Sequence, residues 1–388
     1  MGRIKLSPSS ATRWINCTAS PRLESKMPYT RSVYADEGTL AHTIVEFKLR
    51  RWLDQITEGR LAEALSNAEQ QDLYRAEMLL HAETYLTFVQ EESFKLVKQG
   101  FKPEIYAEQK LDYSDIVGDG RGILDTVIVT PEVLHVIDYK YGKGVAVYAE
   151  NNDQLRIYGL AALGTYGLLH DIKEVHLSIV QPRKEYIGTE VLTVDELWDY
   201  AEKIVIPAAK AARTTKGQFK AGDWCRFCKV KATCRAFSEH VNEQAKKAFA
   251  DPEELTEKEL IEVHELLPKL TSWAKDVENY LVNKALDGQT PKGYKLVYSG
   301  GRRSWIDSEA AADHLRGKGY LDGQILNPGK LKGITDIAGL MAKDDFKAIE
   351  KQFVTKSKGK PTLVKKDHPG QEIGDVNDLA KKVFSQNM

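Results

Sequence analysis

This sequence has few cysteines, no long apolar run and almost no net charge. Four cysteines in 388 residues are too few for a fold held together by disulfides. No run reaches the roughly eighteen apolar residues that span a bilayer, and residues 1–10 lack the apolar stretch of a signal peptide. We therefore expect a soluble cytoplasmic protein without membrane partners. The formal net charge of −1 does not by itself indicate a nucleic-acid binder.

Positive charge is nevertheless concentrated in two segments. Residues 1–31 contain six basic residues and one acid, and residues 207–237 contain eight basic residues and one acid. Such basic runs are usually part of the solvated protein surface. A protein can nevertheless bind the phosphate backbone of DNA through a local basic surface, whatever its net charge. The candidate DNA contacts in these segments are Arg13, Arg22, Arg226 and Lys229.

Hydrophobic periodicity predicts helices around a small sheet. Helices are expected over 11–17, 36–54, 68–98, 150–163 and 194–212, and strands over 104–110, 122–129, 133–140, 175–181 and 188–192. This order is typical of an α/β or α+β fold in which helices flank a central mixed sheet.

The C-terminal third has a different pattern. A capping box at 256–259 begins a long helix that Pro268 is expected to kink or split. A β-hairpin is predicted over 294–306, and a flexible or surface segment over 355–374, which is rich in Lys, Gly and Pro. The predicted domains are a core at 1–240 and, at 241–388, an accessory region of long helix, β-hairpin and flexible basic tail.

Acidic residues interrupt two apolar strands. Asp125 lies within the strand 122–129, and Asp138 and Lys140 end the next strand. Positions i and i+2 of a strand share a face, and a short turn would bring Asp125 alongside. Two carboxylates suit Mg²⁺ or Mn²⁺, while a lysine can activate water or neutralise a phosphate oxygen. The alternative is an acid at a strand end with a lysine extending along the sheet edge.

The order of these residues resembles a nuclease family. G-x-x-D at Asp125, D-x-K at Asp138 and Lys140, and Q-x-x-x-Y from Gln154 to Tyr158 resemble the RecB-like branch of PD-(D/E)XK nucleases, and His42 stands in that branch's upstream G-x-x-x-H setting. The resemblance implies a restriction-endonuclease-like core. The implied Mg²⁺ or Mn²⁺ ligands are His42, Asp125, Asp138 and the Tyr139 carbonyl, and the implied catalytic set is Asp125, Asp138, Lys140, Gln154 and Tyr158.

The cysteines are spaced as a metal site. Cys225, Cys228 and Cys234 cluster, while Cys17 is remote, and four thiolates suit either Zn²⁺ or an iron–sulfur cluster. The spacing resembles that of the Cas4 and AddB nucleases, which implies a [4Fe–4S] cluster that staples the chain and brings the two basic segments together. Neighbouring Trp224 and Phe227 are expected to shield the cluster rather than stack on bases.

A second resemblance concerns origin. Ser7–Cys17 and Gly359–Val364 are similar to phage-encoded proteins of unassigned function. The predicted function is a metal-dependent DNA nuclease, and by analogy an exonuclease, in phage DNA replication or recombination. The expected partners are single-stranded DNA or DNA with free ends, together with phage recombination or single-strand-binding proteins. Two alternatives stay open: a catalytically silent DNA-binding scaffold of the same fold, and a zinc-ribbon replication accessory factor.

Overall fold

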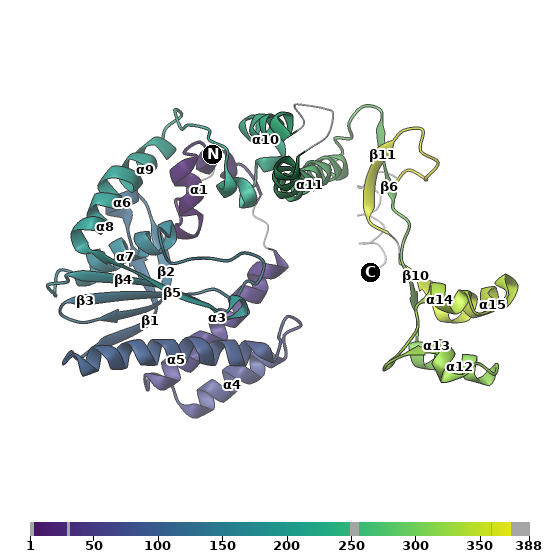
Figure 1. The fold of residues 1–388 in the computed structure, drawn as a ribbon, viewed down its shortest axis with the longest axis horizontal. Coiled ribbons are helices and arrows are strands. Elements are labelled where there is room, and N and C mark those ends of the chain that lie inside the picture. The colour runs from purple at the N-terminus through teal and green to yellow at the C-terminus, as the bar shows by residue number, and fades with distance from the viewer. Residues whose placement is uncertain (1–3, 29–31, 249–255, 358, 374–388) are drawn as a thin grey trace, which may run out of the picture. The chain divides into compact units, whose positions relative to one another are not determined.

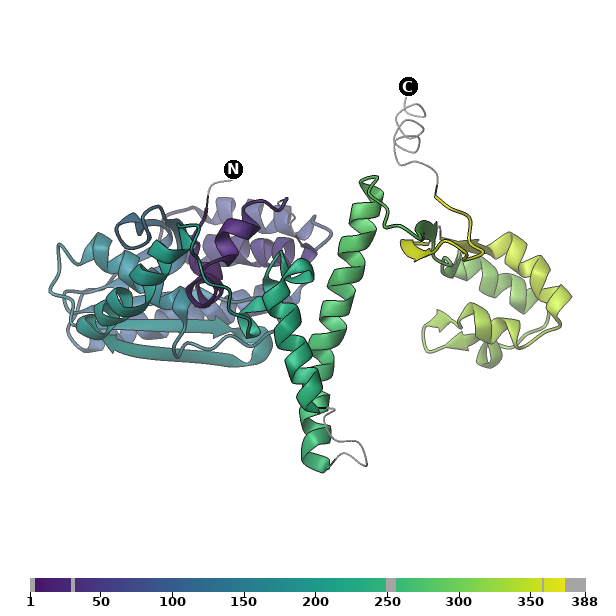
Figure 2. The ribbon, with the colours of Figure 1, turned by 90° about the horizontal axis from the view of Figure 1, so that it is seen from above.

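The computed structural model describes residues 4–28, 32–248, 256–357 and 359–373. The ends of the N-terminal basic segment and the last residues of the predicted basic tail lie outside these ranges. The chain divides into two compact units, Met1–Thr256 and Glu257–Met388 (Figures 1 and 2). Among the described residues, no helix combines the length and apolar character needed to cross a bilayer.

The first unit is built on a five-stranded sheet in the order β1-β2-β3-β4-β5. The strands are β1 Glu104–Asp112, β2 Arg121–Val129, β3 Val133–Tyr139, β4 Glu174–Gln181 and β5 Tyr186–Thr193. Only β3 and β4 pair in parallel, so the sheet is mixed, as predicted. Every residue of β3 is buried, including His135 and Asp138, which interrupt an otherwise apolar strand.

Helices cover both faces of this sheet, so the unit has an α/β fold (Figure 1). One face carries α3 Val33–Trp52, α4 Glu58–Glu69 and α5 Glu77–Lys98, and the other carries α1 Ala11–Asn16, α6 Ser114–Val117, α7 Asp153–Tyr166, α8 Val194–Tyr200 and α9 Ile206–Ala212. The unit also contains α2 Ser20–Glu24 and α10 Arg235–Ala248.

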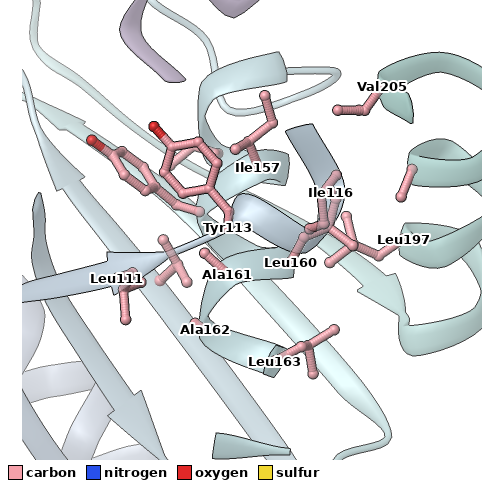
Figure 3. Close-up of a cluster of buried hydrophobic side chains, with 14 of the residues drawn as sticks. Leu111, Tyr113, Ile116, Ile157, Leu160, Ala161, Ala162, Leu163, Leu197 and Val205 are labelled. Carbon is pink, nitrogen blue, oxygen red and sulfur yellow. The ribbon is translucent and has the colours of Figure 1, made fainter. Parts of the chain in front are cut away.

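Two separate apolar cores hold these layers together. In one core, Ile116, Leu160 and Leu197 come from three helices and meet beside the sheet (Figure 3). In the other, Tyr85 of α5 packs against β3, and its hydroxyl donates to the Ile137 carbonyl at 3.2 Å. Because α7 connects the parallel strands β3 and β4, its first turn lies near the end of β3.

Two helix predictions need correction. The single helix predicted over 68–98 is wrong, because α4 ends at Glu69 and α5 begins at Glu77. Both helices pack against α3, so the chain must turn between them, and their shared apolar period does not reveal that turn. The helix predicted over 194–212 contains a π-helical turn at Ala201–Val205 between α8 and α9.

The second unit begins with one long helix, α11 Glu257–Leu286, which continues through Pro268 rather than splitting. The hairpin predicted over 294–306 is wrong. Its two strands, β6 Tyr294–Tyr298 and β7 Arg303–Trp305, pair instead with β11 Pro361–Lys365 and β10 Val354–Lys356. The segment 355–374, predicted to be flexible or at the surface, contributes to both β10 and β11, and its described residues are exposed or half-buried.

These pairs form one interrupted ribbon, because both keep the same register. Between them, Ser299 N–H donates to the Lys360 carbonyl at 2.8 Å and Ser357 N–H donates to the Arg302 carbonyl at 3.0 Å. The chain between the strands folds around its own core, which includes Leu315. It contains α12 Ser308–Gly317, α13 Asp322–Ile325, β8 Leu326–Asn327, β9 Lys330–Leu331, α14 Ile334–Ala338 and α15 Lys343–Phe353.

A buried histidine in the sheet makes the stability of the first unit depend on pH. His135 of β3 is 1% exposed, and its Nε2 lies 2.7 Å from Ser178 Oγ. Burial lowers the pKa of His135 to about 3, with smaller contributions from His176 and Lys95. Glu92 of α5 also faces the ring, with 3.8 Å between its Oε2 and His135 Nδ1.

We predict that the free energy of unfolding falls between pH 7 and pH 5. The unfolded chain binds a proton at His135 near pH 6.5 and the folded chain only near pH 3, so acid favours unfolding throughout that window. The loss assigned to this residue is about 2 kcal/mol at pH 5. Urea unfolding at both pH values should show a smaller loss in His135→Gln than in His170→Gln, a control in the loop before β4. Equal pH slopes in the two variants would contradict the assignment.

Candidate metal and catalytic site

The candidate site lies where the hydrogen-bond ladder between β2 and β3 ends. The last ladder pair is Thr126 with Ile137, so Asp125 and Asp138 are the first residues beyond it. Asp125 Oδ2 accepts a hydrogen bond from the Tyr139 N–H at 2.7 Å. A carboxylate thus satisfies a backbone donor that a neighbouring strand would otherwise have to satisfy.

Helix α3 brings His42 to the same point. Its neighbours Leu40 and Ile44 are buried in the core, which fixes the helix against the sheet. His42 Nδ1 lies 3.1 Å from Asp125 Oδ1, and the imidazole meets the buried Tyr139 ring edge-on with 5.3 Å between centroids.

The two partners change each other's pKa. Burial lowers the pKa of His42, but the Asp125 carboxylate outweighs burial and the net shift is upward. Burial raises the pKa of Asp125, but the His42 ring and the Tyr139 N–H bring it below its ordinary value. The site therefore favours a carboxylate at Asp125.

Glu108 of β1 is a site residue that the sequence reasoning missed. It lies opposite Asp125, has φ of 50°, and is left out of the otherwise continuous β1–β2 ladder. His42, Glu108 and Asp125 each offer a ligand atom, and these atoms lie within 4.8 Å of one another. Burial raises the pKa of Glu108 to about 7, and the Asp125 charge adds to the effect. An acid in the strand predicted at 104–110 was the available signal, but its positive φ was not predictable.

Asp138 belongs to a second, adjoining group. Gln154 Nε2 donates to Asp138 Oδ1 at 2.9 Å, and Lys140 Nζ donates to Gln154 Oε1 at 3.0 Å. Lys140 Nζ also lies 2.9 Å from Asp138 Oδ2, a buried oxygen that has no hydrogen-bond partner besides this ion pair. Burial raises the pKa of Asp138, and the Lys140 ammonium only partly offsets that rise.

The start of α7 positions Gln154. Asn152 caps the helix by accepting hydrogen bonds from the N–H groups of Gln154 and Leu155 at 3.0 and 3.1 Å. Tyr158 is one turn further along and buried, and a Cβ added at Gly122 would lie 3.1 Å from its ring. Tyr158 therefore packs against β2 at the G-x-x-D motif.

The structure thus brings the predicted site residues together in two linked groups. His42 and Asp125 gather with Glu108, whereas Asp138 contacts Lys140 and Gln154. Asp125 joins the groups through the Tyr139 N–H. Among the described residues, the compact ligand group contains Glu108 where the resemblance implied Asp138.

The four cysteines line one small cavity of about 20 Å³. All four are free thiols, and their sulfur atoms do not gather into a three-ligand group as compact as that of His42, Glu108 and Asp125. Trp224 lines this cavity and donates its indole N–H to the Lys220 carbonyl at 2.8 Å. Phe227 does not line it and is 67% exposed, so the expectation that Phe227 shields the thiols is wrong.

Hydrogen bonds join the two basic segments. Ala19 N–H donates to the Gln218 carbonyl at 3.1 Å, and Gln218 N–H donates to Thr18 Oγ1 at 2.8 Å. Lys229 N–H donates to Glu24 Oε1 at 2.9 Å. These backbone and side-chain hydrogen bonds hold the segment that follows Cys17 against the segment that contains the other three cysteines.

The four predicted DNA contacts lie in different settings. Arg13 pairs with Glu24 at 3.1 Å and lines the thiol cavity, while Arg22 has a buried Nε without a hydrogen-bond partner. Arg226 is exposed, with its guanidinium 5.6 Å from the centroid of the Phe227 ring. The side chain of Lys229 is exposed.

Comparison with known proteins places the chain in a family. Residues 4–371 match the family described as "Protein of unknown function (DUF2800)". The chain belongs to that family. A solved structure described as "Crystal structure of SSO0001" is 13% identical, with 56% of this chain and 95% of that chain covered and a TM-score of 0.24. A likeness this distant supports no statement about the DUF2800 protein, so its chemistry has to be argued from its own residues.

We predict that Glu108 contributes to divalent metal binding. Isothermal titration with Mn²⁺ should show binding to the wild type and at least about tenfold weaker binding to Glu108→Gln, because the variant loses an anionic oxygen ligand. Glu104→Gln, on the exposed end of the same strand, is the matched control and should bind like the wild type. Unchanged Mn²⁺ affinity in Glu108→Gln would exclude Glu108 as a ligand.

Proposed function

We propose that this DUF2800 protein is a Mg²⁺- or Mn²⁺-dependent DNA nuclease of the PD-(D/E)XK class that acts on DNA with free ends. One observation carries the proposal: an imidazole and two carboxylates converge within 4.8 Å beside a lysine–carboxylate pair, all at one break in the sheet. A purely structural acid at a strand end has no need of such a group on three neighbouring elements.

The donor set fits a hard divalent ion. Carboxylate oxygens of Glu108 and Asp125 and a nitrogen of His42 are suitable ligands, and the buried Asp138 Oδ2 adds a nearby anionic oxygen. Burial is the main cause of the raised pKa of Glu108, and the nearby Asp125 charge adds to it; a bound cation would stabilise both carboxylates in their charged forms. A bound ion would acidify a water molecule and stabilise charge on the phosphate.

The chain's own residues supply the remaining chemistry. Lys140 Nζ is held between Asp138 and Gln154, so its ammonium is oriented before substrate arrives. From there it can neutralise a phosphate oxygen or position the attacking water. Gln154 is a positioning residue, because its amide contacts both Asp138 and Lys140 and fixes their separation.

We predict that Asp138→Ala and Lys140→Ala each lower DNA cleavage at least about 100-fold, because each removes part of the charged pair at the reacting phosphate. The assay is digestion of end-labelled DNA with Mn²⁺. Lys173→Ala, which breaks a surface ion pair with Glu132, is the control and should cleave normally. Wild-type cleavage in both site variants would remove the assignment. DNA binding without metal-dependent cleavage by the wild type would favour the scaffold alternative.

We further propose that the cysteines hold a [4Fe–4S] cluster. Support comes from the four thiols on one cavity and from ligand chemistry, because four cysteine thiolates are the usual ligands of such a cluster. It would link Cys17 covalently to the 225–234 segment and close a loop of about 200 residues.

We predict that anaerobically purified protein is brown, with broad absorption near about 400 nm, and contains iron rather than zinc. Cys17→Ser should lose the absorption and the iron and should melt at a lower temperature, because the proposed cross-link is gone. The measurements are an absorbance spectrum, metal analysis and thermal unfolding. Stoichiometric zinc with no visible absorption would instead favour the zinc-ribbon alternative.

A further inference from the structure

A second, much larger cavity opens beside the catalytic lysine. Its volume is about 1110 Å³, and Lys140 lines one part of it. The loop after β3 lines it as well, as do Tyr34 of α3 and two residues of the cysteine segment, Arg226 and Phe227. This groove therefore links the candidate catalytic group to the cysteine segment within the first unit.

The floor of the groove is fixed from below. Gln181 at the end of β4 is 1% exposed, and its side-chain amide donates to the carbonyls of Gly142 and Val145 at 2.5 and 2.8 Å. Its oxygen accepts from the Val147 N–H at 2.9 Å. The space next to Gly142 is open, so the floor there is bare backbone. The loop is thus held in shape before any ligand arrives.

The walls of the groove carry positive charge. Lys143 and Arg226 are exposed along it. Arg183 is held by Glu37 and Glu77 at 3.2 and 3.1 Å, and these pairs neutralise part of the charge on that side. The remaining cations suit a polyanion that passes through the groove.

Two exposed aromatic rings flank these cations. Tyr34 is 83% exposed and Phe227 is 67% exposed. Phe227 lies between Cys225 and Cys228, and a hydrogen bond from Cys228 N–H to the Cys225 carbonyl at 3.1 Å holds this short turn. Trp224 of the same turn lines the thiol cavity instead. The cysteine segment therefore places the half-buried Trp224 along the thiol cavity and presents the exposed Phe227 to the groove.

We propose that this groove binds an unpaired DNA strand, with Phe227 stacked on a base and Lys143 and Arg226 contacting phosphates. The inference rests on the proposed nuclease function and names the part of the protein that leads substrate to Lys140. Exposed aromatics interleaved with cations are the features that bind single strands without regard to sequence, because every base has a stacking face. A duplex offers no unstacked base to Phe227, so duplex affinity should not depend on this ring.

The test is binding of a fluorescein-labelled oligodeoxythymidine to the full chain, measured by anisotropy in EDTA so that no cleavage occurs. Phe227→Ala should bind about tenfold or more weakly than the wild type, and Phe227→Trp should restore binding. Phe94→Ala is the matched control, because Phe94 is an equally bulky exposed ring (56%) on α5 that does not line the groove. A labelled blunt-ended duplex should bind Phe227→Ala and the wild type alike.

The outcomes separate this inference from the nuclease proposal. If Phe227→Ala binds the oligonucleotide like the wild type, or if the wild type does not bind it, the groove assignment is overturned even where Mn²⁺-dependent cleavage is found. If Phe227→Ala weakens binding and the wild type cleaves no DNA, the groove stands and the nuclease function fails. Equal loss of duplex and single-strand binding would overturn the stacking role.

Discussion

The candidate site depends on the point where β2 and β3 stop pairing. A buried strand must satisfy its backbone donors, and at this break the Asp125 carboxylate accepts the Tyr139 N–H. The same carboxylate contacts His42. On the neighbouring strand β1, Glu108 lies opposite Asp125 in a left-handed backbone conformation. Three neighbouring elements thereby direct polar side chains to one place in an otherwise apolar sheet. Such a local conflict with sheet geometry is typical of functional sites.

The second group is organised by the crossover from β3 to β4. Helix α7 follows β3 along the chain, and its capped first turn lies near the end of that strand. The side-chain amide of Gln154 therefore contacts both Asp138 and Lys140. Gln181, at the end of the parallel partner strand, shapes the intervening loop by three hydrogen bonds. The positions of Lys140 and of the loop that lines the groove are therefore set by two amide side chains, Gln154 in the first turn of α7 and Gln181 at the end of β4.

The cysteine segment lines the groove beside Lys140 and also lies against the start of the chain. Hydrogen bonds between residues 18–19 and Gln218 hold the segments together. Within that arrangement Trp224 and Phe227 serve opposite surfaces, one lining the thiol cavity and the other lining the groove. The second unit is organised differently, by a single ribbon whose halves are separated by a helical insertion with its own core.

The sequence alone determined the elements around Asp125, Asp138 and Lys140, because short strands joined by a tight turn are set by local apolar periodicity and turn chemistry. It also indicated that His42 and Gln154 belong with them. Only the tertiary structure decided that Glu108 joins His42, because a positive φ within a strand depends on neighbours rather than on local preference. The partners of β6 and β7 likewise lie some 50 residues or more away, so the turn at Ser299–Gly301 misleads any local reasoning. Phe227 is exposed because the other side of its short turn faces the thiols. Which side faces them depends on how residues 225–234 pack against the N-terminal segment that contains Cys17.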